Sequence, residues 1–180
     1  MERRLTLHID TATTELADAL AEVAARTFPL ACPPSSTSED IDAFIAENLS
    51  ADRFARYLTD PDRTVLAARR DGRILGYAMT VRGVPDDPDV QRAVPLRPAI
   101  ELSKMYVLPD CHGAGVSAAL MDAVVRHASA QHAACVWLGV NQQNRRAQRF
   151  YGKHGFEVAG TKTFHLGAEI EHDYVMVRPA

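Results

Sequence analysis

The chain has 180 residues, of which 47% are hydrophobic and 24% are charged, an ordinary globular composition that is sufficient for one substantial core. Its formal net charge of −3 provides no basic field for nucleic acid, and no apolar stretch reaches the length of a signal peptide or a membrane span. We therefore expect a single cytoplasmic domain over residues 1–180 that binds neither nucleic acid nor membrane.

The three cysteines are odd in number, lie far apart and include no C-x-x-C pair. This pattern fits a reducing compartment and indicates neither a disulfide framework nor a zinc site, so we expect no metal. Cys111 lies beside a glycine-containing turn, but no neighbour in the sequence would make it a thiolate. An incidental thiol is therefore favoured over a nucleophile.

The N-terminal third is predicted to be mostly helical, over about residues 13–60. Residues 4–9 suit a first strand, and a helix follows that reaches about Thr27. The stretch 29–38 is rich in proline and serine and is expected to break the chain. Two further helices follow it, the second of them capped by Ser50.

The middle of the chain is predicted to begin with a β-hairpin. Residues 64–70 and 73–82 are strands around the turn Asp71-Gly72. Residues 84–98 contain four prolines and three aspartates, which are too many breakers for a strand interior. We therefore expect this segment to be a loop that borders a substrate site.

A strand over residues 99–108 then runs into a turn that contains Gly113 and Gly115 and opens a helix. With a regular pleat, four residues of this strand share one side: Glu101, Ser103, Met105 and Val107. Glycines let the main chain come close to a ligand, and the unpaired N–H groups of a helix start form a seat for phosphate. A glycine pair is equally typical of a plain tight turn, so this motif alone leaves both interpretations open.

A second motif follows an apolar run suited to a buried strand, residues 134–140. Asn144 can cap a helix that ends at Gly155, after which Phe156 begins another strand. Four residues of that helix fall at i, i+3, i+4 and i+7: Ala147, Phe150, Tyr151 and His154. Its basic residues are expected to form a solvated face, and one of these side chains can contact a phosphate. They are Arg145, Arg146, Arg149 and Lys153.

With these two motifs in this order and spacing, the sequence resembles the GCN5-related N-acetyltransferase (GNAT) superfamily. The pattern Arg/Gln-x-x-Gly-x-Gly/Ala of the superfamily matches residues 112–117, with His112 in place of Arg or Gln and Ser117 in place of Gly or Ala. The pattern Asn-x-x-Ala-x-x-Phe-Tyr-x-x-x-Gly-Phe matches residues 144–156 completely. The resemblance implies a mixed α/β (α+β) fold with a twisted, mostly antiparallel sheet that is splayed between its two middle strands and flanked by helices.

The resemblance also implies acetyl-CoA as co-substrate, coenzyme A as product, and a binding core over about residues 99–156. The residues that it assigns to acetyl-CoA are Met105, Tyr106, Val107, His112, Gly113, Ala114, Gly115, Val116, Ser117 and Asn144. Because histidine is a smaller donor than arginine, we expect a weaker side-chain grip on the pyrophosphate, with the backbone amides unchanged. Asn144 either holds the amide arm of the cofactor or only caps its helix.

Two catalytic candidates follow from the resemblance. Tyr151 occupies the place of the superfamily's tyrosine acid, which protonates the departing thiolate, or it packs as an aromatic on the cofactor tail. Glu101, four residues before Met105, matches a carboxylate used as base by several members, acting through water. A solvated strand glutamate is the alternative. Backbone N–H groups from Met105 to Val107 would stabilise the oxyanion if the strand splays there.

The tail 160–178 is similar to that of Pai-type bacterial spermidine/spermine N-acetyltransferases, which implies a small-molecule amine acceptor and favours a polyamine. Six acids are candidate anchors for it or ordinary surface acids: Asp86, Asp87, Asp89, Glu169, Glu171 and Asp173. A peptide N-terminus, an aminoglycoside or an amino acid is the alternative acceptor. A non-catalytic acyl-CoA-sensing module is the alternative from another class. A homodimer through the late strands is also compatible with the resemblance.

Overall fold

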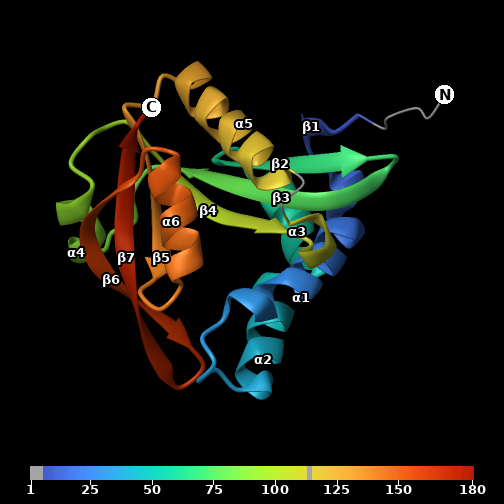
Figure 1. The fold of residues 1–180 in the computed structure, drawn as a ribbon, viewed down its shortest axis with the longest axis horizontal. Coiled ribbons are helices and arrows are strands. Elements are labelled where there is room, and N and C mark those ends of the chain that lie inside the picture. Colours follow the sequence, from blue (N-terminus) through green and yellow to red (C-terminus); the bar gives the residue numbers. More distant parts are fainter. Residues whose placement is uncertain (1–5, 113–114) are drawn as a thin grey trace.

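The computed structural model describes residues 6–112 and 115–180, and its strands form one sheet in the order β1-β2-β3-β4-β5-β7-β6 (Figure 1). The strands are β1 (His8–Thr11), β2 (Arg63–Arg70), β3 (Arg73–Arg82), β4 (Ala99–Val107), β5 (Cys135–Asn141), β6 (Glu157–Leu166) and β7 (Glu169–Pro179). The helices are α1 (Ala17–Ala31), α2 (Ser38–Asn48), α3 (Ala51–Thr59), α4 (Pro88–Ala93), α5 (Val116–Ala130) and α6 (Arg145–Lys153), with 3-10 turns η1 (Thr14–Leu16) and η2 (Pro109–Cys111). Neighbouring strands are antiparallel except β4 and β5, which confirms the predicted mixed, mostly antiparallel sheet.

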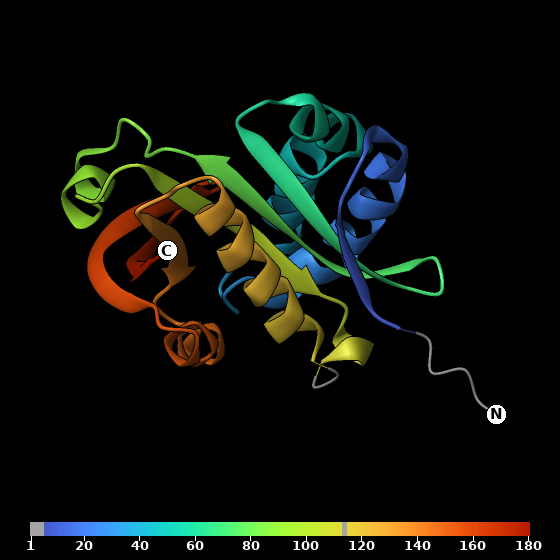
Figure 2. The ribbon, with the colours of Figure 1, turned by 90° about the horizontal axis from the view of Figure 1, so that it is seen from above.

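Helices cover both faces of the sheet. α5 lies on one face, and α1 to α3 lie on the other (Figure 2). The apolar stripe of α1 is buried at Leu20 and Ala24, and that of α5 is buried at Leu120 and Val124, so the strands between them are enclosed in one core. Within the described ranges, no helix is both long enough and apolar enough to cross a membrane.

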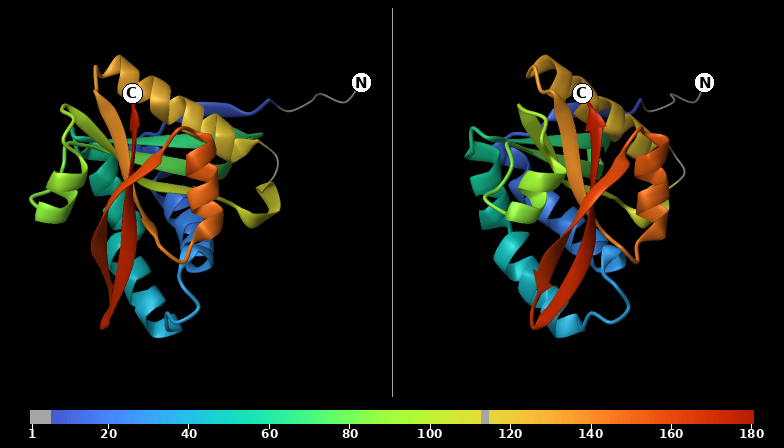
Figure 3. Two further views of the ribbon diagram at one scale, coloured as in Figure 1. Left: turned by 60° about the vertical axis from the view of Figure 1, so that its left-hand side comes forward. Right: turned by 90° about the vertical axis from the view of Figure 1, so that its left-hand side faces the viewer.

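The sheet opens between its two middle strands. β4 and β5 are paired only where Ala99–Glu101 meet Cys135–Trp137, and beyond Glu101 they diverge. β5 pairs with β7 along its whole length instead, and the long β6–β7 hairpin reaches α2, where Gly167 lies against Asp40 (Figure 3). The predicted splay is therefore confirmed, and Glu101 is the last paired residue before it.

β4 does not keep the regular pleat that we expected. Its register with β3 shifts between Met79 and Thr80, so that Ser103 is an extra residue without a partner. A bulge of one residue exchanges the two faces of a strand. The expected face of Glu101, Ser103, Met105 and Val107 is therefore wrong, because the register places Glu101 on one side with Lys104 and Tyr106.

Several expected element boundaries also differ. α1 continues four residues past Thr27 and includes Pro29, which has no N–H to donate to the carbonyl of Ala25 four residues before it. The first strand is His8–Thr11 rather than residues 4–9, of which 4 and 5 lie outside the described residues. The cap predicted for α3 is present: the Ser50 hydroxyl accepts the Arg53 N–H at 3.2 Å at the start of this helix.

The segment 84–98, predicted to be a loop, contains α4. The Asp87 side chain caps this helix by accepting the Asp89 N–H at 2.9 Å, and Pro88 occupies its first turn, where no N–H is needed. Val90 and Val94 are buried against Trp137. The prolines and aspartates that suggested a loop therefore start a short helix, which covers the outer side of β5.

Gly76 holds β3 close to the part of β4 that borders the opening. A Cβ at Gly76 would lie 2.7 Å from the Tyr106 carbonyl oxygen and 3.2 Å from the Val107 Cα, and the backbone of a central strand has little room to yield. We expect Gly76→Ala to lower the free energy of unfolding by about 1–3 kcal/mol in denaturant titrations. Gly152→Ala is the control, since open space surrounds Gly152 in α6 and alanine should stabilise that helix by about 0.5–1 kcal/mol. Equal stability of the two variants would contradict the packing argument.

Candidate active site

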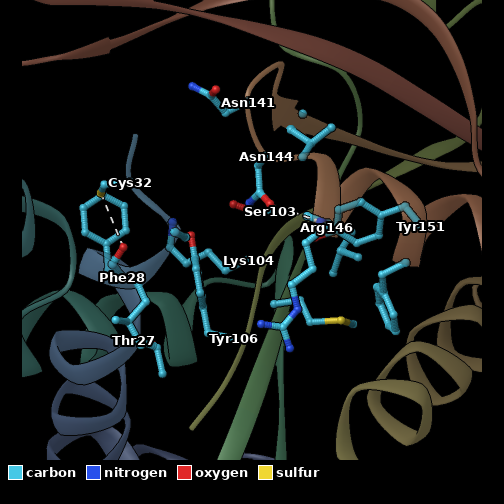
Figure 4. Close-up of a pocket in the computed structure, with 18 of the residues that line it drawn as sticks. Thr27, Phe28, Cys32, Ser103, Lys104, Tyr106, Asn141, Asn144, Arg146 and Tyr151 are labelled. Carbon is cyan, nitrogen blue, oxygen red and sulfur yellow. Dashed lines mark hydrogen bonds between the residues drawn. The ribbon is translucent and has the colours of Figure 1, made fainter. Parts of the chain in front are cut away.

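The opening between β4 and β5 leads into a cavity of about 900 Å³. Its walls come from α1 and α2, from β4 to β7, from the first turn of α5 and from α6, so that segments far apart in the sequence meet there (Figure 4). The volume suits a ligand of cofactor size. The residues along this cavity divide into a phosphate end, at the starts of α5 and α6, and a charged end, between β4, β6 and β7.

The phosphate end contains most of the residues assigned to acetyl-CoA from the sequence. Met105, Tyr106, Val107, His112, Gly115, Ser117 and Asn144 all line the cavity. Gly115 has φ +79° and caps α5, and the first N–H groups of that helix have no partner within the helix. The Val116 side chain is buried in the core instead, because it begins the apolar stripe of α5. Gly113 and Ala114 lie outside the described residues.

The backbone of β4 presents polar groups to the opening. The Leu108 N–H donates to the Leu75 carbonyl at 2.8 Å, and the register pairs Val107 with Gly76. In an antiparallel ladder the hydrogen-bonded pairs alternate, so Tyr106 and Leu108 direct their backbone groups toward β3, whereas Met105 and Val107 direct theirs toward the splay. The N–H groups of Met105 and Val107 therefore face the space where β5 would otherwise pair.

His112 joins two elements at this end. Its Nε2 lies 3.0 Å from the Val107 carbonyl oxygen, and its Nδ1 lies 3.1 Å from Nη2 of Arg146, which also lines the cavity. Asn144 caps α6, because its Oδ1 accepts the Ala147 N–H at 3.1 Å. Helix capping, one of the two roles expected for Asn144, is therefore the role of its Oδ1 atom.

The charged end holds three carboxylates and two ammonium groups. Lys162 of β6 reaches across Gly139 to Asp173 of β7, with its Nζ 3.2 Å from Oδ2. A Cβ at Gly139 would collide with the Lys162 side chain, so the glycine makes room for this pair. Asn141 donates through Nδ2 to Oε2 of Glu171 at 3.2 Å.

Burial changes the acid–base properties of this end. Desolvation raises the pKa of Glu101 above its ordinary value, while Lys162, Lys104 and Arg63 lower it by smaller amounts. Desolvation also lowers the pKa of Lys104, partly offset by Glu101. For Asp173, burial raises the pKa against the opposing effect of Lys162. Groups whose pKa values are moved toward neutrality in a cavity are typical of catalytic sites.

Tyr151 projects from α6 into the same cavity (Figure 4). Its ring makes edge-on contacts with Phe150 and Phe156, with centroids 5.6 and 5.9 Å away and interplanar angles of 64° and 65°. Burial raises the pKa of its phenol to about 12, so the hydroxyl keeps its proton at neutral pH.

Other residues of the site were not predicted from the sequence. Lys104 was not predicted because the bulge at Ser103 reverses the side of β4 to which it points. Cys32 and Phe28 were not predicted because they lie beyond the expected end of α1. Lys162 lies on β6, where the alternation of polar and apolar residues does not indicate a cavity. Asp86, Asp87 and Asp89 were proposed as anchors, but their segment packs behind β5 and does not line the cavity among the described residues.

Comparison with known proteins gives one consistent family. The family described as acetyltransferase (GNAT) domain matches residues 32–170. An uncharacterized N-acetyltransferase of Mycobacterium tuberculosis is 59% identical over 162 residues, which are 90% of this chain and 96% of that protein.

Two solved structures share the fold. The PaiA N-acetyltransferase of Thermoplasma acidophilum, in complex with coenzyme A, superposes with a TM-score of 0.76 at 19% identity, covering 98% of this chain and all of that one. The ribosomal-protein-S18-alanine N-acetyltransferase of Escherichia coli gives a TM-score of 0.65 at 19% identity, with 97% and 94% of the two chains covered.

Proposed function

Because this chain belongs to the GNAT acetyltransferase family and is therefore an N-acetyltransferase that uses acetyl-CoA, we propose that it transfers the acetyl group directly to a primary amine of a polyamine. The observation that carries the proposal is the splay beside Glu101. It provides one cavity with backbone N–H donors facing one end and buried carboxylates at the other.

Acetyl-CoA enters from the phosphate end. The first N–H groups of α5 receive its diphosphate, and the pantetheine arm follows the unpaired edge of β4 in place of a strand. Asn144 uses Oδ1 as a cap, so its Nδ2 donates to an amide carbonyl of the arm. The thioester then lies near Met105 and Val107, whose N–H groups stabilise the oxyanion formed on attack.

The transfer requires three proton movements: two from the nitrogen of the acceptor and one to the sulfur of the leaving group. Glu101 accepts a proton from the incoming ammonium, directly or through water, and the free amine attacks the thioester carbonyl carbon. The C–N bond forms, the C–S bond breaks, and the thiolate takes a proton from Tyr151. After the attack the nitrogen still carries one proton more than an amide nitrogen, and this second proton passes through water to the Tyr151 phenolate. Glu101 then returns the first proton to solvent, so each turnover releases one proton and restores both residues.

A row of carboxylates along β7 supports a polyamine acceptor. Glu169, Glu171 and Asp173 alternate along a regular part of this strand, so their side chains share one face at intervals of about 7 Å. Glu171 and Asp173 line the cavity, and exposed Glu169 lies further out. A polyamine repeats its positive nitrogens through short methylene chains, so one ammonium can react while another meets the outer carboxylate.

A panel of amines tests the acceptor. We expect saturable release of coenzyme A thiol with spermidine and spermine, and a lower kcat/KM with a monoamine of similar length. Glu169→Gln should reduce kcat/KM about threefold for spermidine and leave the monoamine unchanged, because an exposed ion pair contributes little. Glu157→Gln, exposed on β6, is the matched control.

Other outcomes would contradict the proposal in different ways. Turnover of a peptide N-terminus or an aminoglycoside, without turnover of polyamines, would replace the acceptor and keep the reaction. Binding of acetyl-CoA without thiol release on any amine would favour a sensor and remove the reaction itself.

A further inference from the structure

We propose that Arg146, held in place by His112, supplies the cationic contact to the diphosphate of acetyl-CoA. The inference rests on the proposed function in so far as acetyl-CoA is the ligand of this cavity. It assigns different roles to the two residues: His112, which occupies the position expected to grip the pyrophosphate, is a positioning residue, and Arg146 is the phosphate ligand.

The hydrogen bonds of His112 fix its tautomer. A backbone carbonyl only accepts, so Nε2 carries the hydrogen that it donates to Val107 at 3.0 Å. A guanidinium only donates, so Nδ1 carries no hydrogen and accepts from Nη2 of Arg146 at 3.1 Å. Both ring nitrogens of the neutral histidine are therefore occupied, and neither has a proton left to offer to a phosphate.

Arg146 is well placed for the role that His112 does not fill. It lines the cavity together with Gly115 and Ser117 at the start of α5, and its side chain extends from the first turn of α6 toward β4 (Figure 4). One of its five N–H donors is bound to His112, and among the described residues no other hydrogen bond or ion pair occupies the planar fork, which can meet an anion. A guanidinium matches the geometry of a phosphate by paired hydrogen bonds, which a smaller imidazole does not provide.

The histidine bridge also reduces the entropy that Arg146 loses on binding. An exposed arginine samples many rotamers, and ordering them opposes binding. His112 is itself hydrogen-bonded to Val107 at the end of β4, so it holds the guanidinium at the wall of the cavity before the ligand arrives. Arg145 and Arg149 are also exposed on α6 but are outside the cavity lining, which sets Arg146 apart within this basic run.

Calorimetric titration of the full chain tests the assignment of Arg146 with three ligands: coenzyme A, dephospho-coenzyme A, which keeps the diphosphate but lacks the 3′-phosphate, and pantetheine, which lacks both. Loss of a diphosphate contact should weaken coenzyme A and dephospho-coenzyme A equally. We expect Arg146→Ala to raise the Kd for coenzyme A at least about tenfold, as for loss of a charge-assisted pair, and to leave the Kd for pantetheine unchanged. The dependence of affinity on salt should become shallower. Arg149→Ala should match the native protein in all three titrations, and Arg146→Lys should recover only part of the affinity, since it restores charge without the fork.

The role of His112 is tested by a double-mutant cycle. His112→Leu should weaken coenzyme A binding in the native background and have no further effect in Arg146→Ala, because it acts only through Arg146. His112→Gln should restore affinity, since an amide offers one donor for Val107 and one acceptor for Arg146.

Three results would overturn the inference: an unchanged coenzyme A affinity in Arg146→Ala, an equal loss for pantetheine, or additive effects of the two substitutions. The binding measurements are independent of the acceptor. A native protein that binds coenzyme A through Arg146 but acetylates no amine would remove the proposed function and leave this inference standing.

Discussion

Replacement of Tyr151 by phenylalanine is expected to lower kcat at least about tenfold and to leave the Kd for acetyl-CoA within about twofold of the native value. The substitution removes the hydroxyl and keeps the ring that packs on Phe150 and Phe156. Loss of a group that acts only in the transition state lowers kcat and kcat/KM together.

The high pKa of Tyr151 is compatible with an acid role because the thiol that it protonates enters the same environment. Burial raises the pKa of Tyr151 to about 12. Cys32, a thiol in the wall of the same cavity, has its pKa raised to about 11, mainly by burial and further by Glu171. A coenzyme thiolate released in this cavity is also desolvated, so burial raises the pKa of the thiol in the same direction as that of the phenol. Burial of Tyr151 therefore does not by itself oppose the proton transfer.

Tyr106 provides the matched comparison, since its ring also lines the cavity and burial raises the pKa of its phenol well above the ordinary range. Tyr106→Phe should retain kcat within about threefold of the native value. Rapid-quench measurement of the first turnover separates the chemical step from product release. A native first-turnover rate in Tyr151→Phe would show that Tyr151 only packs in the site. A lower first-turnover rate in Tyr106→Phe alone would assign the role of general acid to Tyr106.

The parts of the fold that the sequence predicted well are those whose signals are local. The hairpin at Asp71-Gly72 and the cap at Ser50 each depend on the conformations of a few adjacent residues, and both are present. The match over residues 144–156 indicated α6 and the strand after it correctly. These features are determined within one or two turns of chain.

The parts that the sequence did not predict depend on partners distant in the chain. The bulge at Ser103 is defined by the pairing of β4 with β3, and it alone decides that Lys104 shares a side with Glu101. Prolines and aspartates over residues 84–98 are compatible with a loop or a capped helix, and burial against Trp137 selects the helix. The bridge from His112 to Arg146 joins residues 34 positions apart, so no sequence window contains it.

Replacement of Glu101 by glutamine is expected to lower kcat/KM for the amine by about 100-fold at neutral pH, as for loss of a general base. Glutamine has nearly the same shape but cannot accept a proton from the ammonium. Glu101 is the last residue of β4 that is paired with β5, so its carboxylate stands at the apex of the splay. Lys162→Met is a useful comparison, because it removes a cation that lowers the Glu101 pKa and keeps the base.

The pH dependence of kcat/KM distinguishes a base from a structural carboxylate. Burial raises the pKa of Glu101, so its carboxyl is protonated at a higher pH than that of an ordinary glutamate. The native rate should therefore rise as pH increases through this raised pKa, because the base form appears. In Lys162→Met the acid limb should move to higher pH, and in Glu101→Gln it should disappear. A limb that persists in Glu101→Gln would assign the titration to another group.

Ionisation of Glu101 should lower the free energy of unfolding while it raises kcat/KM. The stability of Glu101→Gln is therefore an independent control on the role of the carboxylate. A carboxyl whose pKa is raised by folding binds more protons in the native state than in the unfolded state, so its ionisation disfavours folding as pH rises from the unfolded pKa through the native pKa. Glu101→Gln should therefore be at least as stable as the native protein at pH 7, while its activity is lost. Denaturant titration at pH 4 and pH 7 measures this, and the stability gained by the substitution should be larger at pH 7. A variant that is both inactive and less stable at pH 7 would indicate that the carboxylate supports the strand, whereas an inactive variant of undiminished stability leaves proton transfer as its role.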